Sequence, residues 1–159
     1  MKRPWNITNP AIYSLISYDE KGKLNMNICS YVTAVSLKPK LYMIAIDYST
    51  KTYQNLKQNS IVVLQLLHQS HLNIIRKLGK SSGHSIDKEK YLNSKNLLHK
   101  WRSNTVLKEV CALMELQKTN EINIDGDHAI FTFSVLKFTT LSENDILTFK
   151  NLIDNKIIL

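Results

Sequence analysis

Short runs rich in apolar and β-branched residues, bounded by polar residues, recur through the first half of the chain, a pattern typical of β-strands. A polar segment with Gly22, from Asp19 to Lys23, follows the first run and predicts a hairpin loop. A run rich in β-branched residues after the first 59 residues predicts another strand. Four strands are expected in this half, over Ala11–Tyr18, Asn27–Leu37, Leu41–Asp47 and Ser60–Leu67, with Leu24 resuming after the hairpin loop and a turn at 38–40.

The second half continues the strand pattern after a polar stretch. Residues 79–104 show no clear periodicity and predict irregular structure. Asp125-Gly126 is a strong turn dipeptide that would join two strands. Strands are expected over Val106–Leu116, Glu121–Asp125 and His128–Phe138.

Helical spacing is confined to three short segments. Lys51–Gln58 follows two hydroxyl residues, and His71–Leu78 carries apolar residues at helical intervals. Residues 142–145 predict the cap of a final helix through Ile153. Many short strands, few helices and no alternation of strand with helix predict a mainly β protein with a barrel, formed by residues 1–159 as one domain without a linker.

Composition fits one compact domain, since 159 residues with 43% hydrophobic content suffice for a single core. The net charge of +8 also fits nucleic-acid binding, but the basic residues are spread along the chain without a run of five, which favours a solvated surface. Cys29 and Cys111 have no metal spacing and are expected as thiols. No apolar stretch approaches 18 residues and the N-terminus lacks a signal-peptide pattern, so we expect a cytoplasmic protein without membrane contact.

Hydroxyls and an ammonium gather where the apolar run Leu41–Ile46 gives way to the first helical pattern. The segment reads Ser49-Thr50-Lys51-Thr52-Tyr53. A helix start offers unpaired N–H groups and a positive dipole, so a phosphate could gain amide, hydroxyl and lysine hydrogen bonds there. An ordinary capped helix is the alternative, because Ser and Thr are favoured caps.

Three separated motifs favour the phosphate site over an ordinary capped helix. Residues 25–41 read NMNICSYVTAVSLKPKL, residues 79–88 read GKSSGHSIDK, and residues 126–131 read GDHAIF. In order and spacing they resemble the signature of the flavin reductase-like family of FMN-binding split barrels: a Ser-aromatic strand, a Pro-x-Leu step, a Ser-Gly-Arg-x-x-Asp-Lys loop and a Gly-Asp-His strand entry. The resemblance covers about residues 10 to 138.

The resemblance implies a Greek-key split β-barrel that binds FMN, or FAD in its place, and takes hydride from NAD(P)H. It implies a catalytic role for His128 beside the nicotinamide or the flavin face. For Lys88 a surface lysine is the alternative to a cofactor contact. The cofactor-binding residues implied are Asn25, Ser30, Tyr31, Val32, Thr33, Ser36, Ser49, Lys51, Thr52 and Lys88.

Two departures from the family pattern keep other functions open. His84 replaces the usual Arg, and Phe133 stands where a glycine is frequent, which would narrow the nicotinamide approach. The first hypothesis is an FMN-dependent reductase passing electrons to free flavin or a protein acceptor. The second is a non-catalytic flavin-binding electron carrier, and the third is a basic nucleic-acid-binding barrel.

The resemblance also implies a homodimer with each flavin site completed by the partner. His68 and His71 have H-x-x-H spacing, but no Cys or carboxylate cluster accompanies them, so we assign no metal.

Overall fold

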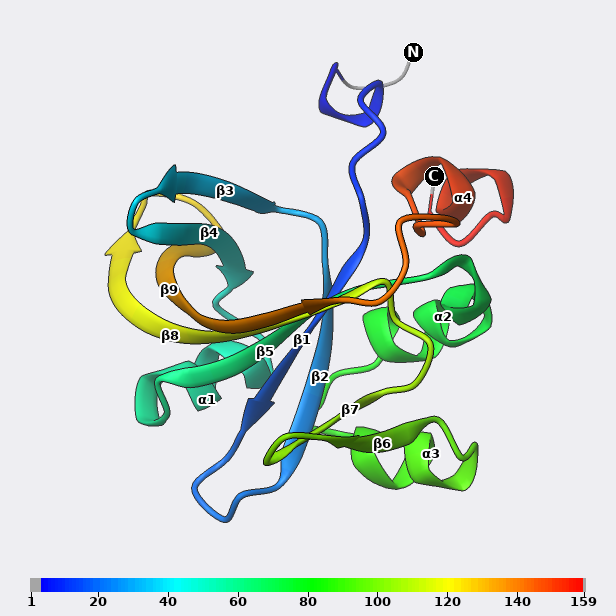
Figure 1. The fold of residues 1–159 in the computed structure, drawn as a ribbon, viewed down its shortest axis with the longest axis horizontal. Helices are drawn as coiled ribbons and strands as arrows, with labels where there is room; N and C mark the ends of the chain where they lie inside the picture. Colours follow the sequence, from blue (N-terminus) through cyan, green and yellow to red (C-terminus); the bar gives the residue numbers. More distant parts are fainter. Residues whose placement is uncertain (1–3, 159) are drawn as a thin grey trace.

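A seven-stranded antiparallel sheet forms the centre of the molecule in the computed structural model, which describes residues 4–158. Its strand order is β2-β1-β5-β8-β9-β4-β3 (Figure 1), and β6 and β7 form a separate hairpin. The protein is thus mainly β, as predicted. The strands are β1 (Tyr13–Tyr18), β2 (Leu24–Cys29), β3 (Val32–Leu37), β4 (Lys40–Asp47), β5 (Ile61–Leu66), β6 (Leu98–Trp101), β7 (Asn104–Leu107), β8 (Ala112–Asn123) and β9 (His128–Thr140).

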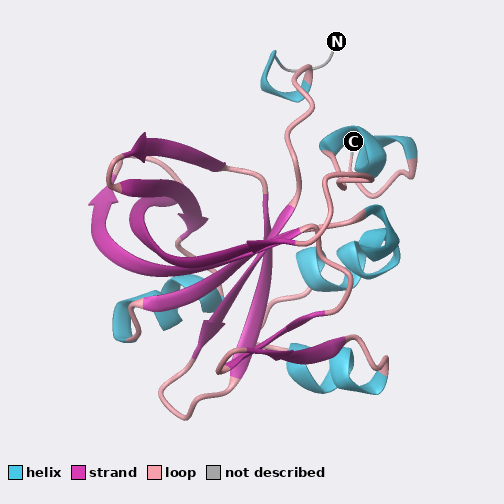
Figure 2. Cartoon of the chain, viewed as in Figure 1, coloured by secondary structure: helices cyan, strands magenta, loops and turns pink. Residues whose placement is uncertain are grey.

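Four short helices and two 3₁₀ turns surround the strands (Figure 2). Helices α2, α3 and α4 lie on one side of the molecule, whereas α1 lies apart from them near β5 (Figure 1). None of the helices within residues 4–158 is long and apolar enough to span a membrane. The elements are η1 (Pro4–Asn6), α1 (Lys51–Gln58), η2 (Gln69–His71), α2 (Leu72–Lys80), α3 (Lys88–Ser94) and α4 (Phe149–Asp154).

The two edge strands of the sheet are consecutive in the chain. β2 pairs only with β1 and β3 only with β4, yet Ser30 and Tyr31 alone connect them. Three Cα–Cα steps allow at most about 11 Å between Cys29 and Val32, so the two edges must approach each other at this corner. β2 and β3 diverge away from it (Figure 1), which gives a barrel that closes at one end and opens at the other.

Strong curvature of β8 and β9 makes this closure feasible. The pair changes register between Glu115 and Leu116 and again between Lys118 and Asn120. Such bulges bend and twist an antiparallel pair. As a result β4 and β3 fold back over the barrel interior, where Leu15, Ile44 and Phe131 are fully buried.

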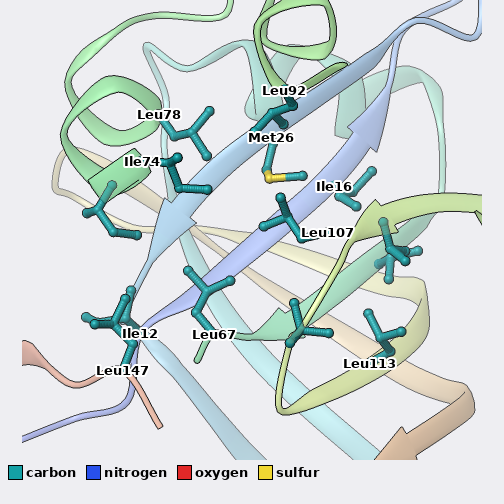
Figure 3. Close-up of a cluster of buried hydrophobic side chains, with 14 of the residues drawn as sticks. Ile12, Ile16, Met26, Leu67, Ile74, Leu78, Leu92, Leu107, Leu113 and Leu147 are labelled. Atoms are coloured by element: carbon teal, nitrogen blue, oxygen red, sulfur yellow. The ribbon is translucent and has the colours of Figure 1, made fainter. Parts of the chain in front are cut away.

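A second apolar cluster fills the space between the sheet and the helices. Ile74 and Leu78 of α2 and Leu92 of α3 lie close to Met26 of β2 (Figure 3). All four side chains are at most 3% exposed. This packing fixes α2 and α3 against the edge strand β2.

Helix α1 has the bounds that the sequence predicts. Thr50 caps its start, because its hydroxyl accepts a hydrogen bond from the amide of Tyr53 at 3.1 Å. At the other end the ammonium of Lys118 donates to the carbonyl of Leu56 in the last turn. Cap and ammonium satisfy groups that a helix leaves unpaired at each end.

Two predictions fail where the chain changes partner or direction. The strand predicted over Asn27–Leu37 is interrupted at Ser30 and Tyr31, because its two parts pair with β1 and with β4. The strand predicted over Val106–Leu116 is also split, since Glu109 adopts φ of 59° between β7 and β8. β8 then continues through the predicted gap at 117–120.

Two further predictions fail because tertiary pairing decides the structure. Residues 79–104 are not irregular but contain α3 and β6. The last helix begins at Phe149 rather than after the polar residues 142–145. The amide of Leu147 donates to the carbonyl of Leu67, and its carbonyl accepts from the amide of Ile12, both at 2.8 Å, which holds this segment extended.

Candidate functional site

A cleft of about 420 Å³ opens at the corner between β2 and β3, and we call it the seam cleft. One wall is polar and comes from the strand ends and from the start of α1. The other wall is apolar and comes from α2, from α4 and from the segments at both chain ends. Its polar residues include Asn27, Ser30, Tyr31, Asp47, Thr50, Lys80 and His128, and its apolar residues include Ile12, Ile75, Phe149, Leu152, Ile157 and Ile158.

A second cleft of about 260 Å³ adjoins the first, and we call it the hydroxyl-rich cleft. The two share Asn27, Asp47, Thr50, Gly79 and Lys80, so they form one continuous depression. The second part is lined by the start of α1 and by the segment after α2. Its other residues are Asn25, Ser49, Lys51, Thr52, Ser81, Ser82, Gly83 and Lys88.

The start of α1 presents an ammonium and backbone amides to the hydroxyl-rich cleft. Lys51 is half-buried and donates from Nζ to Oε1 of Gln54 at 3.0 Å. Ser49 is exposed, and its amide and hydroxyl both donate to Oδ1 of Asp47 at 2.7 Å. These bonds hold the pKa of Asp47 below its usual value, so a carboxylate lies at the edge of the cleft.

The floor of the hydroxyl-rich cleft contains an acceptor without a partner. Asn25 is 6% exposed, and its Nδ2 donates to Oγ1 of the fully buried Thr52 at 3.0 Å. Its Oδ1 is buried and has no hydrogen-bond partner in the described structure. Leaving a buried acceptor unpaired costs about 1–3 kcal/mol, so this position lowers the stability of the fold.

Gly83 lies directly over the side chain of Asn25. A Cβ on Gly83 would lie 2.0 Å from Oδ1 of Asn25 and 3.0 Å from Cβ of Lys51. No larger residue fits without displacing the segment, so glycine is required for the chain to pass this close. The loop after α2, strand β2 and the start of α1 therefore meet at one point.

Lys88 is not a surface lysine, so that alternative was wrong. It is 5% exposed, and its ammonium donates to the carbonyls of Met26 at 2.9 Å and Leu78 at 2.7 Å. Burial lowers the pKa of Lys88 to about 8. Its charge thus lies below the hydroxyl-rich cleft, held between β2 and α2.

His128 lies at the mouth of the seam cleft with two polar neighbours. Its Nδ1 is 2.6 Å from Oδ1 of Asp127, and its ring meets that of Tyr31 edge to face at a centroid distance of 5.5 Å. In the pairing of β9 with β4, His128 lies opposite Asp47 of β4. Because Asp127 engages Nδ1, Nε2 is the nitrogen available to a ligand.

Seven of the eleven residues implied by the resemblance contribute directly to the two clefts. They are Asn25, Ser30, Tyr31, Ser49, Lys51, Thr52 and His128, and the buried Lys88 lies at the floor.

Three residues of β3 lie elsewhere. Val32 packs against the barrel core, and the exposed Thr33 donates from its hydroxyl to the neighbouring carbonyl of Ala34. Ser36 lines a separate groove of about 320 Å³ together with Leu37 and Phe138. β3 runs away from the corner, so its later residues leave the cleft.

Several residues of the clefts were missed from the sequence. Asn27 points to the same side of β2 as Asn25, and this two-residue spacing is a signal that could have revealed it. Asp47 comes just before a recognised motif, and Lys80 lies inside the motif at residues 79–88. The apolar wall from Phe149 to Ile158 had no local signal, because it meets the cleft only through the fold.

The two departures from the family pattern have different positions. Phe133 is fully buried in the barrel beside Phe131 and lines none of the clefts at the corner. His84 is exposed and lines a third cleft of about 240 Å³ with Lys23, Lys51 and Lys88. That Phe133 narrows the nicotinamide approach stays a prediction.

Cysteine and metal chemistry find no support around the clefts. Cys29 lines the seam cleft, but burial raises the pKa of its thiol to about 12. His71 is buried and donates from Nε2 to the carbonyl of Lys108 at 2.9 Å, so it is engaged by the backbone. Within residues 4–158 there is no group of three His, Cys, Asp or Glu residues that could hold a metal ion.

The closed corner, the divergent edges and the clefts beside them define a split barrel of the flavin-binding class. The family model for the flavin reductase like domain matches residues 8–152. The chain therefore belongs to the flavin reductase-like family, which confirms the resemblance. No curated protein matches the chain.

Solved structures agree with this assignment at the level of the fold. An FMN-binding protein of Thermus thermophilus, with bound 1-cyclohex-2-enone, has 17% identity and a TM-score of 0.74 over 88% of this chain and 75% of its own. The Streptomyces globisporus NADH:FAD oxidoreductase has 16% identity and a TM-score of 0.75 over 87% and 80%. The flavin reductase component of a bacterial two-component tryptophan halogenase has 12% identity and a TM-score of 0.78 over 91% and 88%.

The close approach of Gly83 to Asn25 predicts the effect of adding one methyl group there. Gly83→Ala should lower the free energy of unfolding by about 1–3 kcal/mol, because Asn25 or the loop must move. Gly79→Ala is the matched control: its Cβ would have Ile28 Cβ as nearest neighbour at 3.7 Å, and we expect a gain of at most about 1 kcal/mol. Urea unfolding of both variants is the measurement, and equal effects would contradict the close approach.

Proposed function

We propose that the protein is an FMN-binding oxidoreductase that transfers hydride from NAD(P)H to flavin, and from there to free flavin or a protein acceptor. The observation that carries the proposal is the continuous pair of clefts, in which a lysine and hydroxyl groups adjoin a slot with one apolar wall. A flavin mononucleotide has the same division into a phosphate, a polyol and an aromatic ring. The oxidoreductase and reductase components among the similar folds support it.

The hydroxyl-rich cleft is where the phosphate and the polyol would bind. Free amides at the start of α1, the ammonium of Lys51 and the hydroxyl of Ser82 are donors suited to a phosphate. The side chain of Asn27 lines both clefts and is suited to hydrogen-bond the ribityl hydroxyls. The residues present thus fit the nucleotide part of a flavin.

The seam cleft is where the ring would bind. Ile75, Phe149 and Ile157 offer apolar contact and exclude water, while Asn27 and Ser30 offer hydrogen bonds to the polar edge. When bound, the flavin supplies the redox chemistry, and the protein supplies position and electrostatics. Tyr31, at 57% exposed, would cover the open side of the ring beside His128.

His128 is the residue we assign to the nicotinamide side. The carboxylate of Asp127 fixes its Nδ1, so the imidazole orientation is set and Nε2 faces the ligand. In that position it would orient the hydride donor or support charge as it develops. Phe133 lines neither cleft at the corner, and the reductase is the function we favour over a mere electron carrier.

FAD remains an alternative to FMN on geometric grounds. The third cleft shares Asn25, Lys51, Gly83 and Lys88 with the hydroxyl-rich cleft, so an adenylate would continue from one into the other. The exposed His84 and Lys23 would meet that part of the ligand.

We also propose a homodimer in the cytoplasm. Leu37 is 83% exposed and Phe138 is 59% exposed, and both line the 320 Å³ groove under β3. Large exposed apolar side chains that line one groove are typical of an interface. This surface continues through β3 to Tyr31, so a second copy placed on it would also approach the seam cleft.

Flavin affinity tests the phosphate assignment. Lys51→Ala should weaken FMN binding at least about tenfold, because a charge-assisted contact worth roughly 1.5–3 kcal/mol is lost. Lys57→Ala is the matched control on the same helix, since Lys57 pairs with Glu121 away from both clefts. Fluorescence titration with FMN and FAD would check this; equal affinities of the two variants would contradict the phosphate site.

Reduction kinetics test the role of His128. His128→Ala should leave FMN bound but slow reduction by NAD(P)H about ten- to a thousandfold. His99→Ala on β6 is the control, because His99 lies outside the three clefts. Stopped-flow absorbance gives the rates. If wild-type protein binds FMN and neither nucleotide reduces it, the electron carrier replaces the reductase.

Light scattering tests the dimer. Leu37→Glu should convert a dimer to monomers, because it buries a charge in the proposed interface. Ile122→Glu is the control at another exposed apolar position, on β8, and should leave the mass unchanged. A monomeric wild-type protein with full flavin occupancy would exclude the interface.

A further inference from the structure

Lys88 lies where three elements and two clefts meet. It is the first residue of α3, directly after the cap Asp87, and its side chain crosses to the carbonyls of Met26 in β2 and Leu78 in α2. It also lines both the hydroxyl-rich cleft and the third cleft, next to Asn25 and Lys51. Its ammonium is engaged by the backbone, so it is not free to reach a ligand as a flexible surface lysine would.

Negative groups beside the hydroxyl-rich cleft would weaken the binding of an anion there, and the charge of Lys88 opposes them. The start of α1 attracts an anion, but the cleft is also lined by Gly79 and Lys80 at the C-terminal end of α2, where the helix dipole is negative. Asp47 adds a carboxylate at the edge. The carbonyl of Leu78 belongs to that last turn, and the ammonium of Lys88 neutralises it directly.

Other charged groups around Lys88 are already engaged or lie at the rim. Asp87 pairs with Lys23 at 2.8 Å, and Glu89 accepts from the amide of Leu24 at 3.2 Å. Hydrogen bonds keep the pKa of Asp19 and Asp87 low, and Asp87 keeps the pKa of Lys23 high. The remaining charged or titratable groups that line the two clefts are Lys51, Lys80 and His84, and the exposed Lys90 lies one position beyond Glu89 on α3.

We propose that Lys88 supplies the positive charge that allows the hydroxyl-rich cleft to hold a phosphate dianion, and that it does so from the floor without touching the phosphate. The inference rests on the proposed function and deepens it. It makes Lys88 a positioning residue whose charge, rather than whose contact, sets affinity for the phosphate-bearing flavin.

Deprotonation of Lys88 at high pH removes its charge and leaves its two hydrogen bonds in place. Burial lowers its pKa to about 8, so the side chain loses its charge in mildly alkaline solution. A neutral amine retains two N–H donors, enough for both carbonyls, so the local structure persists while the charge is lost. A bound dianion favours the charged form, so affinity is full below pH of about 8 and falls as pH rises through it.

The experiment compares two flavins over pH 7 to 9.5, where the phosphate is a dianion throughout. FMN carries the phosphate, and riboflavin carries the same ring without it. The ratio of the association constant for FMN to that for riboflavin therefore isolates the contribution of the phosphate. For wild-type protein the ratio should fall about tenfold across this range. Lys88→Arg keeps its charge and should show a nearly constant ratio. Lys88→Met should show a low and constant ratio.

Wild-type protein provides an independent measurement if the variants fail to fold. Calorimetry in buffers of different ionisation enthalpy at pH 8 should detect proton uptake on binding FMN but not on binding riboflavin. A similar pH dependence in wild type and Lys88→Arg, or no FMN-specific proton uptake, would overturn the role of Lys88. Failure to bind either flavin at pH 7 would instead refute the proposed function, and the inference with it.

Discussion

The two-residue connection at Ser30 and Tyr31 is the constraint on which the structure depends. It joins the two edges of a seven-stranded sheet, and a chain of this length cannot span an open sheet. The sheet must therefore curl until its edges meet at this corner. The bulges in β8 and β9 supply the bend, and Phe131 and Phe133 fill the interior that the bend creates. Closure also brings Tyr31 against His128, which is nearly a hundred residues away.

The same corner explains why the clefts are there. Where β2 ends and β3 begins, the two strands part, and Asn27 and Ser30 line the cleft at this corner. α1 begins beside this opening because β4 returns to it, and α2 ends beside it because it packs on β2. A helix start and a helix end thus face one depression, with opposite effects on an anion.

Two buried polar groups at the hydroxyl-rich cleft lower the stability of the fold. Oδ1 of Asn25 is buried without a partner, and the ammonium of Lys88 is buried with a lowered pKa. Neither arrangement helps folding, since a paired amide and an apolar side chain would cost less. Departures of this kind concentrate where proteins bind ligands. Elsewhere in the barrel, Leu15, Ile44 and Phe131 form an ordinary apolar core.

The sequence by itself determined the elements whose signals are local. Apolar and β-branched runs predicted β1, β4 and β5, alternation predicted β9, and Thr50 with Lys51 predicted the start of α1 through capping. Residues of the motifs around Asn25, Lys51 and His128 line the clefts. Only the tertiary structure decided what depends on distant partners: the break at Ser30, the pairing that delays α4 to Phe149, the burial of Lys88 and the apolar wall opposite His128. Pairing and burial are set by residues far apart in the chain, so no local pattern records them.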